Sequence, residues 1–303
     1  MNENHFGKII LQKENINLID CKICKFIHIN PLPTEEELLK FYQKEFYQKV
    51  KPTYLKKDEE EIQYWNMSYD EKLNILETKK IKNKKILDIG SGGGFFLRRA
   101  KEKGWNVLGI EPSLTAAKYA EKHKIPTIKN FFEKVDFSKQ KKFGAIHMNA
   151  VLEHSRSPNQ ILKIAHNILE KKGMLIVEVP NEFNPLQLIA QKSLKKDEWW
   201  VVPKEHLNYF NFKSLSKLLK RNGFEITLKQ ATFPLEIFLL MGFDYINNPK
   251  VGLKKHQERM KFEQNMNSQN AQELKQKIYQ KFAEIGIGRR AIIYAKKEKE
   301  KLF

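Results

Sequence analysis

The chain has 303 residues, of which 41% are hydrophobic and 30% are charged, an ordinary balance for a globular protein. This length suits one α/β domain of roughly 200–250 residues with an additional segment. No apolar run approaches the roughly 20 residues that a membrane helix requires, so we expect no membrane span. The net charge of +19 would suit a polyanionic partner, but only seven basic residues are arginine, the better side chain for bidentate phosphate recognition.

The first residues and the cysteine content indicate the compartment. The start, "MNENHFGKII", lacks a basic region followed by an apolar core, so we expect no secretory signal. Two cysteines, Cys21 and Cys24, are too few for a disulfide framework. We therefore expect a cytoplasmic protein with reduced thiols. Lysines alternate with glutamates along the predicted helices, so the charge alone does not indicate nucleic acid as a partner.

Residues 1–79 are predicted to form an N-terminal cap. Short strands are expected at "KIILQ" and "KFIHIN". Thr34 and Glu37 fit a capping box, and apolar residues follow at helical spacing as far as Phe46. A second helix is predicted over about 64–79.

From Lys85 onward, short β-branched runs alternate with helical segments, the pattern of parallel βαβ units. Seven strands are predicted, at "KILDIG", "NVLGIE", "TIKN", "FGAIHMNA", "GMLIVEVP", "EITLKQA" and "RRAIIYAKK". Helices are expected to start near Phe95, Ser113, Glu133 and Pro158, and Gly173 is expected to end the last of these. A polar helical insertion over about 245–285 separates the last two strands. Residues 80–303 are thus predicted to form one α/β domain.

The stretch "ILDIGSGGGFFLRRAKEKGWNVLGIEPS" predicts a nucleotide-type site: a strand, a glycine loop, a helix and a second strand that ends at Glu111. Glycines let a ligand approach the backbone, and a carboxylate at Glu111 can accept two hydrogen bonds from a ribose diol. The dinucleotide fingerprint would require a glycine at position 95, which is Phe95. Asp88 inside the first strand also suits an ammonium or sulfonium ligand better than a pyrophosphate.

These blocks resemble the class I S-adenosylmethionine-dependent methyltransferases. "ILDIGSGGG" is similar to their first motif, "VLGIEPS" to the next, and "NAVLEHSRSPNQILKIAHNILEKKGMLIVEVPN" to a later stretch. The resemblance covers about residues 85–232. It implies a Rossmann-like, seven-stranded mixed sheet with helices on both faces and strand seven antiparallel beside strand five. It also implies S-adenosylmethionine as cofactor.

The resemblance implies a cofactor site made of Asp88, Gly90, Ser91, Gly92, Gly94, Glu111, Pro112 and Asn149. Asp88 and the loop backbone would hold the methionine end, and Glu111 would bind the ribose hydroxyls. Pro112 would lie beside the adenine, with Asn149 near the sulfonium. The family often places an acid after strand three for the adenine amino group, but "KNFFEK" offers Asn130 and no clear acid.

The acceptor side is predicted at "WWVVPKEHLNYFN", which follows the fifth strand and so lies at the carboxyl edge of the sheet. Methylation of a hydroxyl or of a carbon acid requires an aligned nucleophile and the removal of a proton. The block resembles a segment of sugar methyltransferases. That resemblance implies that His206 is the base and Glu205 its orienting or substrate-binding partner. The alternative is that His206 caps the next helix or holds a loop, and we assign His154 in "VLEH" no catalytic role.

The segment "CKICKFIHINPLPTEEELLKFYQKEFY" resembles one that precedes the catalytic domain in these sugar enzymes and often ends a four-cysteine zinc site. Here no first C-x-x-C is present, and Lys25 replaces the usual glycine. Two thiols alone do not complete a tetrahedral site, although His5 or His28 could add ligands. We interpret the segment as a zinc-knuckle-like remnant that has lost its metal, and we expect no stoichiometric zinc.

His256 and Arg259 are three residues apart and share a face of a predicted helix. They are candidates for binding an anionic group, such as the phosphate of a nucleotide-linked sugar. The alternative is an ordinary solvated basic face.

The sequence thus predicts methyl transfer from S-adenosylmethionine to a saccharide, either a nucleotide-linked sugar or a surface glycan. O-methylation is favoured over C-methylation because the long C-terminal domain of typical C-methylating relatives is missing. Two alternatives stay open: methylation of RNA or another polyanion, and a non-catalytic protein that binds the cofactor or a partner. The intact glycine loop and Glu111 argue against loss of cofactor binding.

Overall fold

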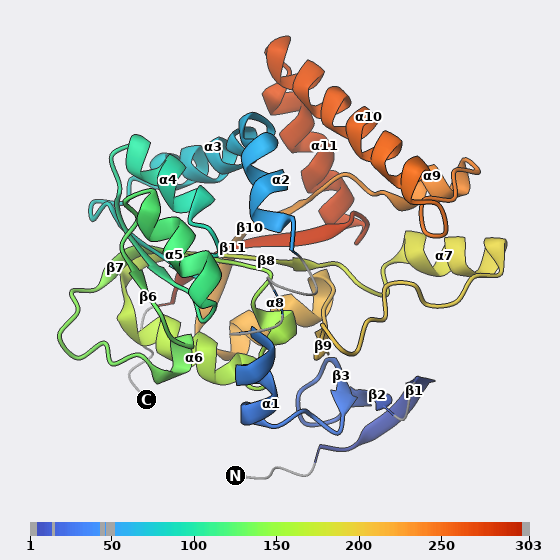
Figure 1. Cartoon of the computed structure of the whole chain (residues 1–303), viewed down its shortest axis with the longest axis horizontal. Coiled ribbons are helices and arrows are strands. Elements are labelled where there is room, and N and C mark those ends of the chain that lie inside the picture. Colours follow the sequence, from blue (N-terminus) through green and yellow to red (C-terminus); the bar gives the residue numbers. More distant parts are fainter. Residues whose placement is uncertain (1–4, 14–15, 43–45, 47–51, 299–303) are drawn as a thin grey trace.

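The computed structural model describes residues 5–13, 16–42, 46 and 52–298. Its main sheet has seven strands in the order β10-β11-β8-β7-β4-β5-β6 (Figure 1). The strands are β4 (Lys85–Ile89), β5 (Asn106–Ile110), β6 (Thr127–Ile128), β7 (Phe143–Asn149), β8 (Leu169–Pro180), β10 (Phe224–Ala231) and β11 (Arg290–Lys297). β4 to β8 pair in parallel, whereas β11 runs antiparallel between β8 and β10. The predicted fold class is confirmed, including the antiparallel seventh strand beside the fifth.

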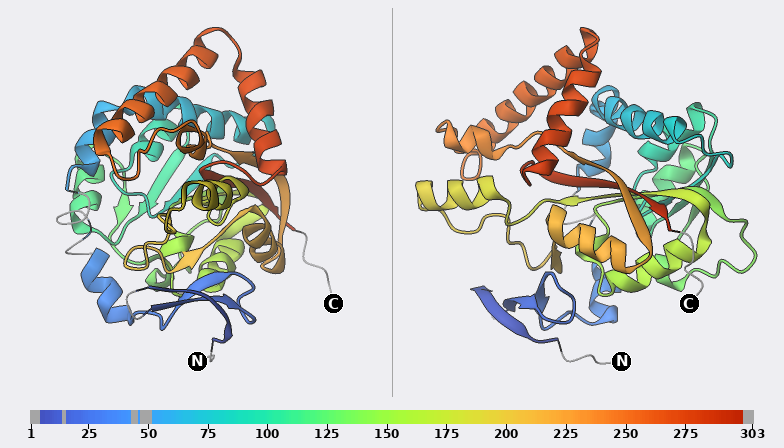
Figure 2. Two further views of the ribbon diagram at one scale, coloured as in Figure 1. Left: turned by 90° about the vertical axis from the view of Figure 1, so that its right-hand side faces the viewer. Right: turned by 180° about the vertical axis from the view of Figure 1, so that it is seen from behind.

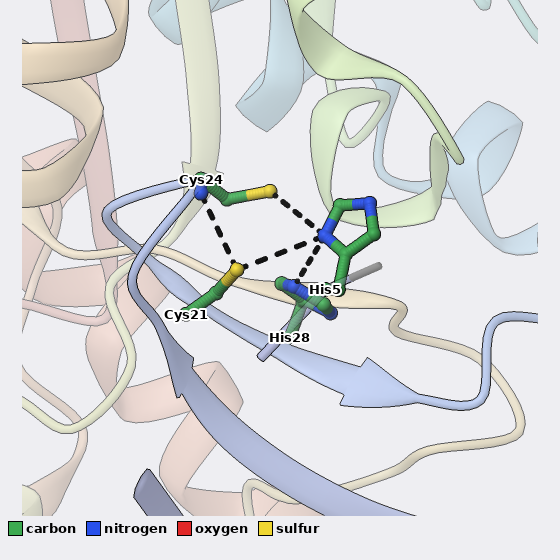
Figure 3. A group of neighbouring side chains, drawn as sticks. All are labelled: His5, Cys21, Cys24 and His28. Atoms are coloured by element: carbon green, nitrogen blue, oxygen red, sulfur yellow. Dashed lines mark hydrogen bonds between the residues drawn. The ribbon is translucent and has the colours of Figure 1, made fainter. Parts of the chain in front are cut away.

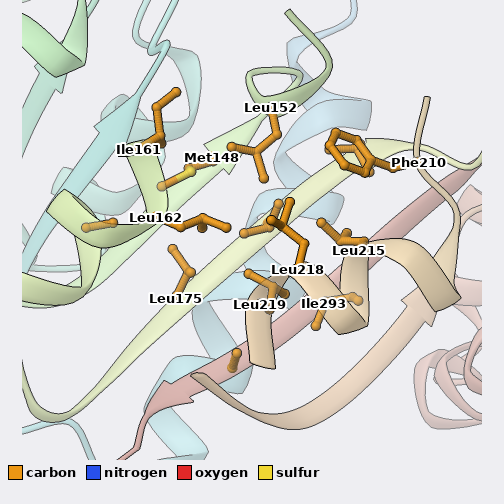
Figure 4. Packing of buried hydrophobic residues seen from close by; sticks show 14 of the residues in the cluster. Met148, Leu152, Ile161, Leu162, Leu175, Phe210, Leu215, Leu218, Leu219 and Ile293 are labelled. Atoms are coloured by element: carbon orange, nitrogen blue, oxygen red, sulfur yellow. The ribbon is translucent and has the colours of Figure 1, made fainter. Parts of the chain in front are cut away.

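Helices cover both faces of this sheet. α3 (Ile62–Thr78) and α4 (Phe95–Glu102) pack on one face. α6 (Pro158–Ile168) and α8 (Phe212–Arg221) pack on the other, and Figure 4 shows the apolar side chains of this second face. In β11, Ile293 belongs to the α6–α8 cluster, whereas its neighbours Ile292 and Tyr294 belong to the α3–α4 cluster. Because both faces are buried, the strands read as continuous apolar runs instead of alternating ones.

Two predicted helix boundaries are wrong. α6 ends at Ile168 because β8 begins at Leu169, so Gly173 lies inside a strand and does not end the helix. The helix expected near Glu133 is a single 3₁₀ turn, Phe132–Lys134. The expected starts near Phe95, Ser113 and Pro158 agree with α4, α5 (Leu114–Lys122) and α6.

A second, four-stranded sheet lies at the N-terminal end of the chain, in the order β1-β2-β3-β9. Its strands are β1 (Gly7–Lys13), β2 (Ile16–Cys21), β3 (Ile27–Asn30) and β9 (Asn208–Tyr209). The sequence analysis missed β2. β9 comes from the later part of the chain, so residues after the predicted boundary at 79/80 complete the N-terminal sheet. The two-part division at that boundary stays a prediction.

The remaining helices surround these sheets. They are α1 (Glu35–Lys40), α2 (Tyr54–Glu60), α7 (Pro185–Leu194), α9 (Glu236–Leu240), α10 (Pro249–Ser268) and α11 (Gln272–Glu284). The Thr34 capping box starts α1 as expected, and residues 43–45 of that predicted helix lie outside the described residues. α10 and α11 occupy the predicted insertion and lie at the opposite end of the molecule from the N-terminal sheet (Figure 2). Within the described residues, no helix combines the length and the apolar character needed to cross a bilayer.

A buried ion-pair network around Glu178 of β8 connects the sheet to α3. Lys72 Nζ donates to one carboxylate oxygen of Glu178 at 2.6 Å, and Arg290 Nη1 donates to the other at 3.2 Å. Burial alone would raise the pKa of Glu178, but the two cations hold it at about 2. Arg290 also donates to Asn149 Oδ1 at 2.6 Å. The network therefore links α3, β8 and β11 to the end of β7.

Glu178→Gln should strongly destabilise the fold, because it leaves Lys72 and Arg290 without their buried counter-charge. We expect the free energy of unfolding to fall by roughly 3–5 kcal/mol, measured by denaturant titration. Glu77→Gln is the control: it removes an exposed pair with Lys84 and should cost about 0–1 kcal/mol. Equal losses in the two variants would contradict a structural role for the Glu178 network.

Candidate active site

A cavity of about 650 Å³ opens at the carboxyl ends of β4, β5 and β7. Its wall includes nine of the residues that the sequence analysis selected: Asp88, Gly90, Ser91, Gly92, Glu111, Pro112, Asn149, Glu205 and His206. Gly94 is not among the lining residues; it is the N-cap of α4, where an added Cβ would lie 3.0 Å from the Cβ of Ala120. A glycine at this position therefore lets α4 pack closely against α5.

The glycine loop presents bare backbone to this cavity. Gly90 and Gly92 have φ values of 68° and 52°, in the left-handed region that favours glycine. A Cβ at Gly90 would also lie 2.7 Å from the Val151 side chain. The amides of Gly90 and Ser91 donate to the Ile110 carbonyl at 2.8 and 3.1 Å, which fixes the loop against the end of β5.

Glu111 is held in one orientation by two backbone amides. Gly92 N donates to its Oε2 and Ser113 N to its Oε1, both at 2.8 Å. Burial raises the pKa of Glu111 to about 7, although these amides partly oppose the shift. Each carboxylate oxygen can accept more than one hydrogen bond, so both retain capacity for a ribose hydroxyl.

Asp88 is oriented by a neighbour on the next strand. The register of the parallel pair places it beside His147 of β7, whose Nδ1 lies 2.7 Å from Asp88 Oδ1. The His147 ring stacks on Phe96, with ring centroids 4.0 Å apart. The sequence analysis missed His147; a polar residue within the apolar run "FGAIHMNA" was the available signal.

Asn149 lines the cavity at the end of β7, but its carboxamide oxygen accepts the hydrogen bond from Arg290. Arg289 and Arg290, at the start of β11, also line the cavity. Both arginines were missed, because they are separated from the cofactor motifs by more than a hundred residues. They bring positive charge to a wall otherwise rich in acids.

On the acceptor side, Glu182 is the carboxylate that contacts His206. Its Oε1 lies 3.0 Å from His206 Nδ1. Glu182 is buried, and burial raises its pKa to about 8, with Arg289 opposing the shift. Glu182 thus occupies the orienting position that the sequence analysis assigned to Glu205, whose backbone carbonyl lies 2.6 Å from His154 Nδ1; the orienting role of Glu205 stays a prediction. Glu205 stays a predicted substrate-binding residue.

Glu153 and His154 extend this acid–histidine group. One ligating atom from each of Glu153, His154 and His206 lies within 4.8 Å of the others, and the two imidazole rings meet edge to face at 5.1 Å. Burial raises the pKa of Glu153 to about 8. Glu182 follows β8 at the carboxyl edge of the sheet. The sequence analysis selected His206 because ligands bind at this edge, and the same reasoning could have identified Glu182.

His256 and Arg259 do share a face of α10, as predicted, because Arg259 Nη2 lies 3.0 Å from His256 Nδ1. Neither residue lines the cavity. His256 Nε2 instead contacts the Glu61 carboxylate at 3.1 Å, and the Arg259 guanidinium lies over the Tyr64 ring. They attach α10 to α3, and their predicted substrate-binding role, for which this cavity offers no support, stays a prediction.

A family model described as a methyltransferase domain matches residues 59–229, which is more than half of the chain. The chain therefore belongs to the class I S-adenosylmethionine-dependent methyltransferases. It is an enzyme of that class, with S-adenosylmethionine as its cofactor.

Curated relatives are named ubiquinone biosynthesis O-methyltransferases. The one from Glaesserella parasuis serovar 5 (strain SH0165) is 28% identical over 158 residues, which is 48% of this chain and 65% of that protein. The mitochondrial one from Rattus norvegicus is 25% identical and is matched over 50% of each chain. The chain thus covers less than two thirds of these relatives. The solved plantazolicin methyltransferase BpumL, in complex with SAH, shares the fold, with a TM-score of 0.50, 14% identity and coverage of 87% of this chain and 95% of that one.

Glu111→Ala should weaken S-adenosylhomocysteine binding by at least tenfold, because charged hydrogen bonds contribute about 1.5–3 kcal/mol each. Calorimetry is the measurement. With unmodified protein, affinity should rise as the pH increases through about 7, since only ionised Glu111 accepts both hydroxyls. Glu121→Ala is the control, because Glu121 lies near the C-terminal end of α5, pairs with Lys129 and does not line the cavity. Unchanged affinity in Glu111→Ala would remove Glu111 from the site.

Proposed function

We propose that the protein transfers the methyl group of S-adenosylmethionine to an acceptor hydroxyl, with His206 as the general base. The observation that carries this proposal is that His206, in the wall of the cavity that also contains Asp88 and Glu111, is contacted by the buried Glu182 at 3.0 Å. A histidine held by a buried carboxylate is the usual arrangement for proton removal from a hydroxyl.

Bound S-adenosylmethionine supplies a methyl group already activated by its positive sulfur. In its ionised form, which predominates above its pKa of about 8, Glu182 accepts the Nδ1 hydrogen of His206, so Nε2 is the nitrogen that takes the acceptor proton. The Glu182 carboxylate then stabilises the imidazolium. As the new O–C bond forms, the S–C bond breaks, and the protein releases a methyl ether and S-adenosylhomocysteine.

For the acceptor we propose a saccharide, either a nucleotide-linked sugar or a surface glycan. The cavity wall near His206 combines many hydrogen-bonding groups with aromatic rings, the two kinds of surface that a sugar ring offers its partners. The polar members are Glu153, Ser155, Arg156, Gln160 and Glu205, and the aromatic ones are Tyr42, Phe46 and Phe131. O-methylation remains preferred to C-methylation. The expected cytoplasmic location rests on the cysteine content and forms part of the proposal.

A phenolic hydroxyl is the second candidate acceptor. It is favoured by the names of the curated relatives, which are O-methyltransferases of ubiquinone biosynthesis. Aromatic rings in the cavity wall would also suit a phenol.

A paired acceptor screen distinguishes the two candidates. Purified protein with labelled S-adenosylmethionine should methylate a pool of nucleotide sugars and glycan fragments, and mass spectrometry should show the added mass of one CH₂ group. A catechol such as 3,4-dihydroxybenzoate is the phenolic probe. Labelling of the catechol alone would overturn the saccharide acceptor and keep hydroxyl methylation; labelling of neither pool would contradict both.

His206→Ala should lower turnover by ~10²-fold or more, whichever hydroxyl is the acceptor, because proton removal is lost. Glu182→Gln should also lower kcat, since Gln cannot stabilise the imidazolium. S-adenosylhomocysteine affinity should be unchanged in both variants. Glu205→Gln is the matched comparison and should raise KM more than it lowers kcat. Near-normal turnover of His206→Ala would exclude the base role.

A further inference from the structure

Four metal-ligating side chains meet at the N-terminal sheet, outside the active-site cavity (Figure 3). His5 Nδ1 lies 3.3 Å from Cys24 Sγ, 3.7 Å from Cys21 Sγ and 3.1 Å from His28 Nε2. All four candidate ligand atoms lie within 4.8 Å of one another. With Zn–S near ~2.3 Å and Zn–N near ~2.0 Å, neighbouring ligands of a tetrahedral site lie roughly 3.3–3.8 Å apart. The three distances from His5 Nδ1 to the other ligand atoms are close to these tetrahedral separations.

The turn that carries the two cysteines brings both sulfurs to one side. Lys25 N donates to the Cys21 carbonyl at 2.9 Å, and Cys21 N donates to the Phe26 carbonyl at 3.2 Å. Lys25 has a φ of 62°, so it adopts the left-handed conformation without being glycine. Cys24 N donates to Cys21 Sγ at 3.3 Å, a contact that stabilises a thiolate. The missing glycine therefore does not prevent the turn.

His28 is oriented for metal binding through its Nε2. Its Nδ1 lies 2.7 Å from the carbonyl oxygen of Ile29. A carbonyl oxygen only accepts, so Nδ1 carries the hydrogen and the Nε2 lone pair is directed at the cluster. A backbone carbonyl that fixes the far nitrogen is a common outer-shell feature of metal-bound histidine. His28 is also 1% exposed, so its orientation is set by the sheet.

We propose that His5, Cys21, Cys24 and His28 bind one Zn²⁺ in a tetrahedral Cys₂His₂ site. Two thiolates and two imidazoles form a donor set that favours zinc over harder cations. Four protein ligands fill the coordination shell, so the role is structural. The site replaces the expectation of a lost metal, which rested on the missing cysteines; histidines from a segment before β1 and from β3 take their places.

This site would also stabilise one wall of the acceptor region. His28 pairs in register with Asn208 of β9, and Ile29 N donates to the Leu207 carbonyl at 2.9 Å. Asn208 lies two residues beyond His206. A metal that fixes β3 therefore fixes the strand that continues from the His206 loop, whereas Asp88 lies in β4 and Glu111 directly follows β5, both strands of the other sheet.

Metal analysis of the full-length purified protein tests the site directly. We expect about one zinc per chain, released when both thiols are modified. Replacement by Co²⁺ should give the visible absorption of tetrahedral cobalt with thiolate-to-metal charge-transfer bands. Substoichiometric zinc after incubation with Zn²⁺, together with no tetrahedral cobalt spectrum, would overturn the proposal. So would a Cys21–Cys24 disulfide in protein that has never been exposed to oxidant.

Variants test the ligand set. His5→Ala and Cys24→Ser should each lose most of the bound zinc, whereas His123→Ala, beside Arg98 at the end of α5, should keep it. Full zinc retention in His5→Ala would exclude His5 as a ligand and overturn the Cys₂His₂ assignment. S-adenosylhomocysteine binding reports folding of each variant; where one fails to fold, the cobalt spectrum of the unmodified chain decides.

Chelation gives a readout that does not depend on activity. Removing the metal from the unmodified protein should speed hydrogen exchange in peptides covering residues 27–30 and 207–209. Peptides covering β4 and β5 should exchange at an unchanged rate. Unchanged exchange in the first two segments would refute the structural role assigned to the metal.

Discussion

The arrangement of the active site depends on the buried ion pairs that the carboxylate of Glu178 forms with Lys72 and Arg290. This carboxylate lies in the centre of the main sheet and is neutralised by Lys72 from α3 and Arg290 from β11. Removing one partner of such a group leaves a buried charge uncompensated, which is far more costly than losing a surface pair. Arg290 also donates to Asn149 Oδ1, so the network that attaches α3 to the sheet also orients a side chain of the cavity wall at the end of β7.

Two further buried acids lie at the cavity: Glu111 in its wall, and Glu182 in contact with the wall residue His206. Burial raises the pKa of both Glu111 and Glu182, but their partners differ. Glu111 accepts from backbone amides, which fix a carboxylate for recognition of hydroxyl groups. Glu182 contacts an imidazole, which fixes a base. In the proposed function, the same side chain in the same kind of surroundings therefore binds the cofactor in one place and supports proton transfer in the other.

The N-terminal sheet contributes to the site through β9. This two-residue strand follows the His206 loop and pairs with β3, so the position of His206 depends on a sheet formed mostly by the first thirty residues. Trp200 and Leu207 pack with Leu18 and Ile29 in the core of that sheet. A metal at His5, Cys21, Cys24 and His28 would add a fixed point to a sheet whose own apolar core is small.

The sequence alone predicted the α/β class, the succession of seven strands along the chain and the candidate cofactor residues Asp88, Gly90 and Glu111, which line the cavity. These features depend on neighbouring residues: apolar runs of strand length, glycines that reach left-handed φ values, and an acid at a strand end. Only the tertiary structure decided which distant side chains meet. Strand register places His147 beside Asp88, and packing places Glu182 beside His206. It also turns His256 toward Glu61 and brings His5 to the two cysteines. Such pairings depend on register and helix packing, which local sequence does not encode.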